Sequence, residues 1–277
     1  MCRIACSLRF LFSLLLAQIL LAGSAYAEES LWKVLEPGFS LAHFTPDTDG
    51  LSAANIVVLR LDPEEVEFVL LSASHKGNAA SLSGWADAHN LAAAINASMY
   101  LPDGVTSTGY MRNGESLNNA RIMTNFGAFF VAGRRDGGKP SATLLDRTQD
   151  DWETALPLYD IVVQNYRLIS ADGRMLWMPG GPSYAAAAIG QDTHGNILFI
   201  HSREPMSGEN FGNLLLTLPL DLRMVMYVEG GTQASMLVRA GDVDKVWMGR
   251  HMADFLTSGN KNAPLPNVLG VRRKPSP

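Results

Sequence analysis

"RMVMYVEGGTQASM", residues 223–236, is the stretch that decides how this chain is interpreted. An apolar run ends on Glu229, and Gly230 and Gly231 follow, with mostly small hydroxyl and amide residues after them. An acid that directly follows a buried run usually needs a partner, and glycines let the backbone approach a ligand closely or adopt positive φ. The pattern predicts a strand that delivers a carboxylate to the edge of a sheet, beside a ligand.

Two other stretches follow the same pattern, in which an apolar strand ends in polar and small residues. They are "AAAINASMYLPDGVTSTGYMRNG", residues 92–114, and "IVVQNYRLISADGR", residues 161–174. Asn96 ends the first apolar run and Gln164 ends the second. Side chains at sheet ends, with small residues beside them, form the floor and rim of ligand sites. We therefore expect these distant segments to converge on one cavity.

The remaining sequence predicts more strands than helices. Residues 54–61 and 66–73 are predicted to be a pair of strands around the turn "DPEE", and residues 185–202 a hairpin around "DTHGN". Helices are expected at 81–90, capped by Ser81 or Ser83, at 148–157, and at 207–220, capped by Ser207. Further strands are expected at 91–96, 126–133, 159–165, 167–177, 223–228 and 266–273. These elements predict an α+β (mixed α/β) fold: a large mixed, mostly antiparallel sheet packed with a few helices in a single domain.

The first 27 residues have the features of a secretory signal. Arg3 and Arg9 precede an uncharged apolar stretch that ends in Ala25-Tyr26-Ala27. We expect cleavage after Ala27, a mature domain at 28–277, and an exported protein that is periplasmic or secreted, without a stable membrane anchor. An uncleaved anchor is the alternative, although the apolar run is near the lower length limit for a membrane span.

Charge and cysteine content narrow the classes of function. The full chain has 22 basic and 27 acidic residues, and loss of Arg3 and Arg9 leaves 20 against 27, a mature net charge of −7. This balance argues against a nucleic-acid partner, because phosphate backbones require a basic face. Cys2 and Cys6 both lie in the predicted signal, so thiol catalysis and zinc–thiolate sites are excluded from the mature chain. No nucleophile elbow, P-loop, dinucleotide fingerprint or zinc-protease motif occurs.

Five sequence blocks, in order, resemble the phosphodiester glycosidase family, over a region from about Asn55 to Val271. The family's bacterial members commonly have "INAGMF…P.G.Y..NG", "GNFF", "QSGP.L", "R.A(I/V)G" and "LYLDG..S". This chain has "INASMYLPDGVTSTGYMRNG", "FGAFF", "VVQNYRLI", "AAAIG" and "MYVEGGTQAS" at 95–114, 126–130, 162–169, 186–190 and 226–235. One branch of the family removes N-acetylglucosamine from a phosphodiester. The resemblance implies that the chain has the fold of this family. It also implies that the chain hydrolyses a glycosyl phosphodiester in envelope or extracellular glycans.

The chain departs from the family pattern at positions suited to chemistry. Ala186 stands where the arginine of "R.A(I/V)G" is expected, and Glu229 stands for the aspartate of "DG". Asn165-Tyr166 replaces the "GP" after the glutamine, and Ser98 replaces the glycine of "NAG". Two interpretations stay open: an exported hydrolase, or a non-catalytic descendant that binds a glycan or an anionic ligand.

The resemblance, together with the strand-end pattern, assigns roles to named residues. Glu229 is the candidate catalytic carboxylate, and Asn96 is the candidate residue that holds a sugar hydroxyl beside it. The alternative for each is a structural role, in which its side chain only forms hydrogen bonds within its own loop or turn. The predicted substrate-binding residues are Gln164, Arg203, Gly230, Gly231, Thr232 and Ser235. Arg203 is the first choice to replace the cation missing at Ala186; Arg112 and Arg121 are alternatives, and His201 could also serve. We expect a carbohydrate or glycosyl-phosphate ligand and no cofactor; a divalent cation at Glu229 stays open, although no loop has calcium-binding spacing.

Overall fold

The strand predicted from the opening stretch is β13 (Leu222–Gly230), and it lies inside the larger of two antiparallel sheets. The computed structural model describes residues 31–46, 55–250 and 263–275, so the predicted signal segment lies outside the described residues. In the 11-stranded sheet β13 pairs with β11 (Tyr184–Asp192) on one side and with β10 (Tyr159–Ile169) on the other. The other strands of this sheet are β1 (Lys33–Glu36), β2 (Phe39–Phe44), β3 (Ile56–Leu61), β6 (Met111–Asn113), β7 (Ser116–Asn119), β8 (Ala128–Arg134), β9 (Ala142–Asp146) and β12 (Ile197–Met206).

A second sheet of five strands receives the chain directly after the glutamate loop. Its order is β15 (Val243–Met248), β14 (Ser235–Ala240), β5 (Ala93–Asn96), β16 (Asn267–Arg273) and β4 (Val66–Ser72). The segment between β13 and β14 contains the 3-10 turn η2 (Gly231–Gln233). The loop that carries the candidate residues is therefore the crossing between the two sheets.

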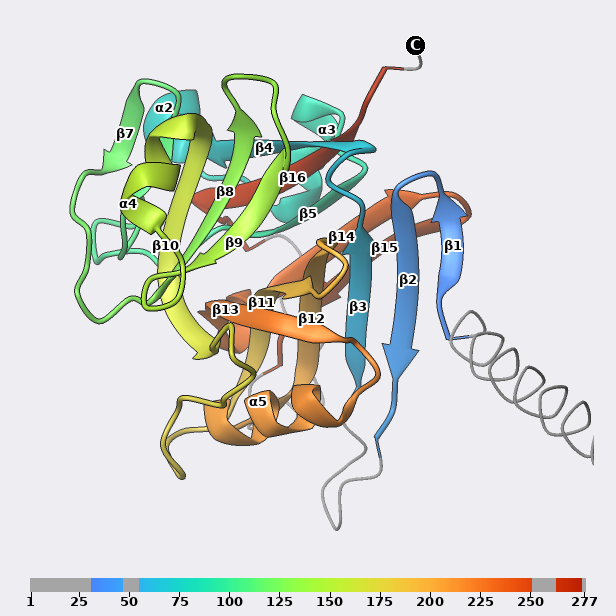
Figure 1. Ribbon diagram of the computed structural model, residues 1–277. Helices are drawn as coiled ribbons and strands as arrows, with labels where there is room; N and C mark the ends of the chain where they lie inside the picture. Colours follow the sequence, from blue (N-terminus) through green and yellow to red (C-terminus); the bar gives the residue numbers. More distant parts are fainter. Residues whose placement is uncertain (1–30, 47–54, 251–262, 276–277) are drawn as a thin grey trace, which may run out of the picture.

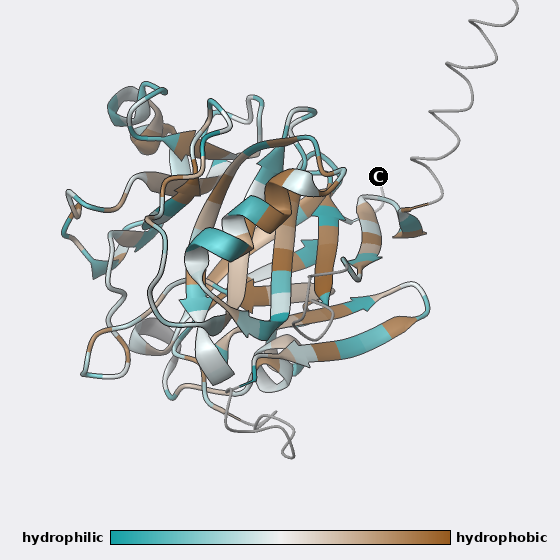
Figure 2. Ribbon diagram, turned by 90° about the horizontal axis from the view of Figure 1, so that it is seen from below, coloured by the Kyte–Doolittle hydropathy of each residue, from teal (hydrophilic) through white to brown (hydrophobic). Residues whose placement is uncertain are grey.

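The two sheets pack face to face, and helices cover their outer faces (Figure 1). The main apolar core lies between the sheets and includes Phe130, Phe199 and Met236. Helix α5 (Gly208–Thr217) packs Phe211 and Leu215 on the large sheet, and Figure 2 shows it lying across the strands. Helix α3 (Leu82–His89) covers the second sheet with Leu82, Trp85 and Ala86. The remaining short helical elements are α2 (Ala73–Lys76), α4 (Trp152–Ala155) and η1 (Leu156–Leu158).

Most sequence predictions of single elements are confirmed. Ser81 caps α3 by accepting a hydrogen bond from Gly84 N, and Ser207 caps α5 by accepting one from Asn210 N. The hairpin around "DTHGN" is β11–β12. The mixed α+β class, dominated by antiparallel strands, is also confirmed.

Two predictions of strand arrangement were wrong. The strands around "DPEE" do not pair: β3 joins the large sheet and β4 the second sheet, because the turn carries the chain across the core. The two strands predicted at 159–165 and 167–177 are instead one strand, β10, whose register with β13 shifts between Arg167 and Ile169 without a break. Within the described residues, no helix is both long and apolar enough to span a membrane.

Candidate active site at the sheet crossing

Glu229 lies at the end of β13, where the chain leaves the large sheet. Its Cα partner on β11 is Ala187, and the residue is only 8% exposed. The backbone N–H of Gly230 donates to its Oε1 at 2.9 Å. Burial raises the pKa of Glu229 to about 7, and the Gly230 hydrogen bond offsets only part of that rise. Glu229 is therefore a buried carboxyl group that changes charge near neutral pH.

Tyr227 lies close enough to Glu229 to feel its charge. Burial raises the pKa of the Tyr227 phenol, and the charge of Glu229 adds to that rise. A Cβ built on Gly230 would lie 2.2 Å from the Tyr227 hydroxyl, so this glycine makes room for the phenol. Gly231 has φ of +71°, which a residue with a side chain rarely adopts. The two glycines of the opening stretch therefore have separate reasons to be glycine.

Asn96, at the end of β5, holds the loop from the second sheet. Its Nδ2 donates to Gln233 O at 3.0 Å, and its Oδ1 accepts from Ser235 N at 2.7 Å. The Ser235 hydroxyl donates to Gln233 O at 2.6 Å, so Ser235 points into its own turn. Asn96 and Ser235 therefore fix the conformation of the turn 230–235. Direct contact of either residue with a sugar stays a prediction.

His201 holds the same loop from the large sheet. It is fully buried on β12, and its Nε2 lies 3.1 Å from Ala234 O. Because a carbonyl oxygen can only accept, Nε2 carries the proton and Nδ1 is an unprotonated acceptor. Burial lowers the pKa of His201 to about 4, so the ring is neutral at pH 7. No described residue hydrogen-bonds Nδ1.

Gln164 lies on β10, and its amide holds a segment other than the turn 230–235. Its Oε1 accepts from Met123 N at 2.9 Å, and its Nε2 donates to the carbonyls of Met123 and Phe126 at 2.8 and 2.9 Å. These bonds hold the segment before β8. A role for Gln164 in contacting substrate stays a prediction.

Asn165, the next residue, is the side chain that reaches the second sheet. Its Nδ2 donates to Ala97 O at 3.0 Å, beside Asn96. Asn165 Oδ1 and Ser98 Oγ are both buried, and neither has a hydrogen-bond partner in the part of the chain that the structure describes. Such orphan atoms are uncommon in folded proteins and require an explanation. In the sequence both residues stood out only as departures from a family pattern. The pair of amides Gln164-Asn165 after an apolar run was the available signal for a role of Asn165.

The remaining candidates differ in their surroundings. Thr232 is exposed on the turn, and Gly230 and Gly231 are half-buried. Arg203 is exposed on β12, close enough to His201 to lower the pKa of that ring slightly. Ala186 lines a small pocket of about 130 Å³ with Trp177, Tyr184 and Tyr227. The position of the missing family arginine therefore faces aromatic side chains.

The site thus joins Asn96, Glu229 and the turn 230–235, held by hydrogen bonds from strands of both sheets. Glu229, a carboxyl group that titrates near pH 7, can stabilise positive charge or accept a proton. In the described residues, no three histidine, cysteine, aspartate or glutamate side chains gather in a metal-binding arrangement.

Comparison with solved structures finds proteins of similar fold. A hypothetical protein from Synechocystis has a TM-score of 0.60 at 12% identity; the match covers 86% of this chain and 62% of that one. The catalytic domain of zebrafish N-acetylglucosamine-1-phosphodiester alpha-N-acetylglucosaminidase, auto-inhibited by its pro-peptide, has a TM-score of 0.57 at 11% identity, covering 87% of this chain and 86% of that one. No protein of curated function matches the sequence.

The family model for phosphodiester glycosidases matches residues 89–272. That region contains Asn96, β10 to β13, the glycine turn and most of both sheets. It therefore includes every residue of the candidate site and most of the chain. The chain belongs to the phosphodiester glycosidase family.

Proposed function

We propose that this protein hydrolyses a glycosyl phosphodiester, that is, a sugar-1-phosphate ester, in envelope or extracellular glycans. Family membership supports a glycosidase-like activity. The observation that carries the proposal is Glu229, a buried carboxyl group with a pKa of about 7 on a turn held from both sheets. The zebrafish enzyme of similar fold is named for such a phosphodiester, and this likeness supports the choice of substrate.

In the proposed reaction the bond between the anomeric carbon and the ester oxygen breaks. Its electron pair leaves with the phosphate, and water adds to the anomeric carbon, giving a free sugar and a phosphomonoester. The transition state resembles an oxocarbenium ion, so the Glu229 carboxylate would stabilise the positive charge or accept a proton from water. The phosphate is already a weak base, so a strong general acid is less necessary.

The neighbouring residues would act mainly by holding Glu229 in place. Asn96 and His201 fix the turn through Ser235, Gln233 and Ala234. A displacement of about 1 Å in a catalytic group can lower a rate about a hundredfold. Thr232, exposed on the turn, is our candidate donor to the phosphate or the sugar, and Arg203 our candidate cation.

The position of bond cleavage tests this proposal. The purified mature chain would be incubated with methyl esters of N-acetylglucosamine, glucose and mannose 1-phosphates in water enriched in heavy oxygen. Phosphorus NMR is expected to detect unlabelled methyl phosphate while the label enters the sugar. Label in the phosphate, or release of sugar 1-phosphate, would indicate a phosphodiesterase instead. Glu115→Gln is a matched control for Glu229→Gln, because the Glu115 side chain is 97% exposed.

Export is part of the proposal and rests on the signal-like residues 1–27. The mature chain should begin at Glu28. Expression of the full sequence in a bacterium, followed by fractionation and N-terminal sequencing, tests this point. Recovery of the chain in the cytoplasm with residues 1–27 still attached would contradict it.

A second function, non-catalytic binding of a glycan or an anionic ligand, is favoured by one observation. Ala186 stands where the family pattern has an arginine, and it lines a pocket with aromatic walls. If no substrate in the panel is cleaved while glycans bind both wild type and Glu229→Gln, this second function is the better account.

A further inference from the structure

A second, larger cavity is formed by the end of β10, the segment after it and two earlier segments, residues 124–127 and 147–148. Its volume is about 770 Å³, within the range of about 300–1,000 Å³ typical of small-molecule sites. Its lining includes Tyr166, Arg167, Trp177, Arg147 and Thr124. We call it the Tyr166–Trp177 cavity. None of these residues was a candidate in the sequence analysis, because none ends an apolar strand beside small residues.

Aromatic side chains form one wall of this cavity. The Tyr166 and Trp177 rings are 5.9 Å apart and nearly perpendicular, and Phe126 supports Tyr166 at 4.2 Å. The Trp177 indole N–H donates to Arg167 O at 3.2 Å, which fixes the ring. Half-buried aromatic rings with fixed orientations are rigid contact surfaces with an apolar face, suited to the apolar faces of sugar rings.

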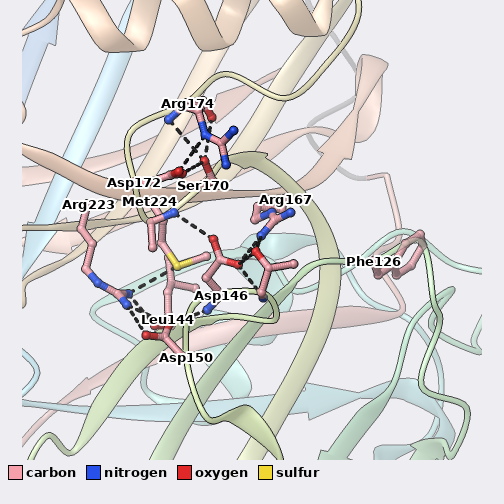
Figure 3. Close-up of polar contacts among 12 residues, drawn as sticks. Phe126, Leu144, Asp146, Asp150, Arg167, Ser170, Asp172, Arg174, Arg223 and Met224 are labelled. Carbon is pink, nitrogen blue, oxygen red and sulfur yellow. Dashed lines mark hydrogen bonds and ion pairs between the residues drawn. The ribbon is translucent and has the colours of Figure 1, made fainter.

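Arg167 brings a positive charge to the cavity, and the buried Asp146 holds its guanidinium in place. Asp146, fully buried, forms an ion pair with it and also accepts from Thr148 N, the Thr148 hydroxyl and Ala171 N (Figure 3). The guanidinium lies over Gly127, where an added Cβ would be 3.1 Å from Arg167 Nε. That Nε is buried and has no hydrogen-bond partner among the described residues.

Arg147 brings a second positive charge without a carboxylate of its own. Its Nη1 donates to the carbonyls of Met123 and Thr124 at 2.9 and 3.1 Å, and its guanidinium lies 5.2 Å from the centroid of Trp152. No ion pair of Arg147 occurs within residues 31–46, 55–250 and 263–275. Of the two guanidinium groups only that of Arg167 is paired within the described residues, with Asp146, and the cavity lining has no acidic side chain, so the cavity keeps a net positive charge.

The cavity adjoins the small pocket that contains Ala186 and Tyr227. Trp177 lines both this cavity and that pocket. Tyr166 is the Cα partner of Tyr227, which precedes Glu229 by two residues. A ligand in the small pocket beside Tyr227 that extends past Trp177 would therefore reach the two arginines.

We propose that the Tyr166–Trp177 cavity binds an acidic sugar unit, a saccharide that carries a carboxylate or a phosphate, within a longer substrate. The aromatic wall contacts the sugar ring, and Arg147 and Arg167 pair with its anionic group. This inference rests on the proposed function for its biological meaning, since it names the substrate class as an acidic glycan. It places the cationic recognition at Arg147 and Arg167 rather than at the position occupied by Ala186.

Binding of four probes to the mature full-length chain tests the inference, measured by calorimetry with wild type and with Glu229→Gln. The probes are a neutral disaccharide, the matching disaccharide with a uronic acid, the same disaccharide with a phosphate on a primary hydroxyl, and inorganic phosphate. One or both acidic disaccharides should bind about tenfold more tightly than the neutral one and than inorganic phosphate. The better of the two identifies the anionic group.

Variants locate the binding site. Arg147→Gln should lower the affinity for the preferred acidic disaccharide about tenfold without changing that for the neutral one. Arg174→Gln is the matched control, since Arg174 is 69% exposed and its only ion pair among the described residues is with Asp172 in the same turn. Arg167→Lys keeps a charge above Asp146 and provides a second test if Arg147→Gln melts at a lower temperature.

Equal affinity for neutral and acidic disaccharides would overturn the inference, and so would the absence of all binding. Inorganic phosphate binding as tightly as the acidic disaccharides would also overturn it, because the cavity would then be a simple anion site. Failure of the proposed function gives a different result: no phosphodiester is cleaved, yet the acidic disaccharides still bind Glu229→Gln, and Arg147→Gln still lowers their affinity about tenfold.

Discussion

Asp146 and Glu229 are both buried carboxyl groups at strand ends, yet their pKa values move in opposite directions. For Asp146, burial alone would raise the pKa, but hydrogen bonds from Ala171 and Thr148 and the charge of Arg167 lower it. For Glu229, burial raises the pKa and only the Gly230 N–H opposes it. The number of donors therefore decides whether a buried acid is a fixed structural anion or a group that changes charge near neutral pH.

The two carboxyl groups also have different roles, one at the Tyr166–Trp177 cavity and one at the sheet crossing. Asp146 has enough donors to remain ionised and to hold Arg167 in the Tyr166–Trp177 cavity. Glu229, at the sheet crossing, accepts a hydrogen bond only from Gly230 N among the described residues. Asn165 and His201, which bond Ala97 O and Ala234 O, and Ser98 each have a buried polar atom without a partner in that part of the chain. Unsatisfied polar groups are costly to stability and recur at functional sites. The predictions below test this contrast.

The largest expected effect is on catalysis. Glu229→Gln should lower kcat/KM for the cleaved phosphodiester about a thousandfold, within the range of about 10²–10⁴ typical of general acid–base groups. In wild type, kcat/KM should rise with pH and level off above about pH 7, because the ionised carboxylate is the active form. The pH profile of steady-state rates measures this. A fall in kcat/KM through the same range would indicate that the protonated form is active instead.

Asp146→Asn should have the next largest effect, on stability. The change removes the charge that pairs with Arg167, and breaking a buried ion pair on one side costs about 3–5 kcal/mol. The folded pKa of Asp146 is lowered, so its contribution is present above the unfolded value and is lost as pH falls through the folded one. Urea unfolding should therefore give a loss of about 4 kcal/mol near neutral pH, and a smaller loss in acid.

Asp172→Asn is the control for this measurement, because Asp172 is 40% exposed. It should change the free energy of unfolding far less than Asp146→Asn does, because solvent screens an exposed ion pair. A loss for Asp146→Asn as small as the control's would indicate that the ion pair does not organise this region.

Glu229→Gln should shift stability in the opposite direction. Because the folded pKa is raised from 4.5 to about 7, the wild type loses stability as pH rises between those values. Each pH unit in that window corresponds to about 1.4 kcal/mol. The variant lacks this loss and should be more stable than wild type by about 3 kcal/mol above pH 7, with no difference below about pH 4. Equal slopes of stability against pH for the two proteins would contradict a raised pKa.

The sequence predicted the local features of this contrast better than the long-range ones. The apolar run before Glu229, the glycines after it and the caps Ser81 and Ser207 are all set by neighbours in the chain, and their structure was as expected. Family membership, from five ordered blocks, was also predicted correctly. These signals depend on periodicity and short spacings.

What the sequence could not provide depends on partners distant in the chain. The ion pair of Asp146 with Arg167 requires β8 to lie between β9 and β10, and no pattern near either residue indicates it. The division of strands over two sheets depends on pairings such as β3 with β12, whose partners Val57 and His201 are far apart in sequence. The Gln164 amide was likewise taken up by Tyr110, Met123 and Phe126, which lie outside strands β6 and β7 and so follow no periodic pattern.

Asn96→Ala should have the smallest of the four effects. Asn96 makes two hydrogen bonds to the turn, through Gln233 O and Ser235 N, each worth about 1 kcal/mol. The expected loss of stability in urea is therefore about 2 kcal/mol, against less than about 0.5 kcal/mol for the exposed control Asn213→Ala. If Asn96 only positions the turn, kcat should fall while KM for the phosphodiester changes little, and Asn96→Asp, which keeps the acceptor for Ser235 N, should recover part of the rate. A rise in KM with unchanged kcat would instead indicate that Asn96 contacts the sugar directly, because only uniform binding would then have been lost.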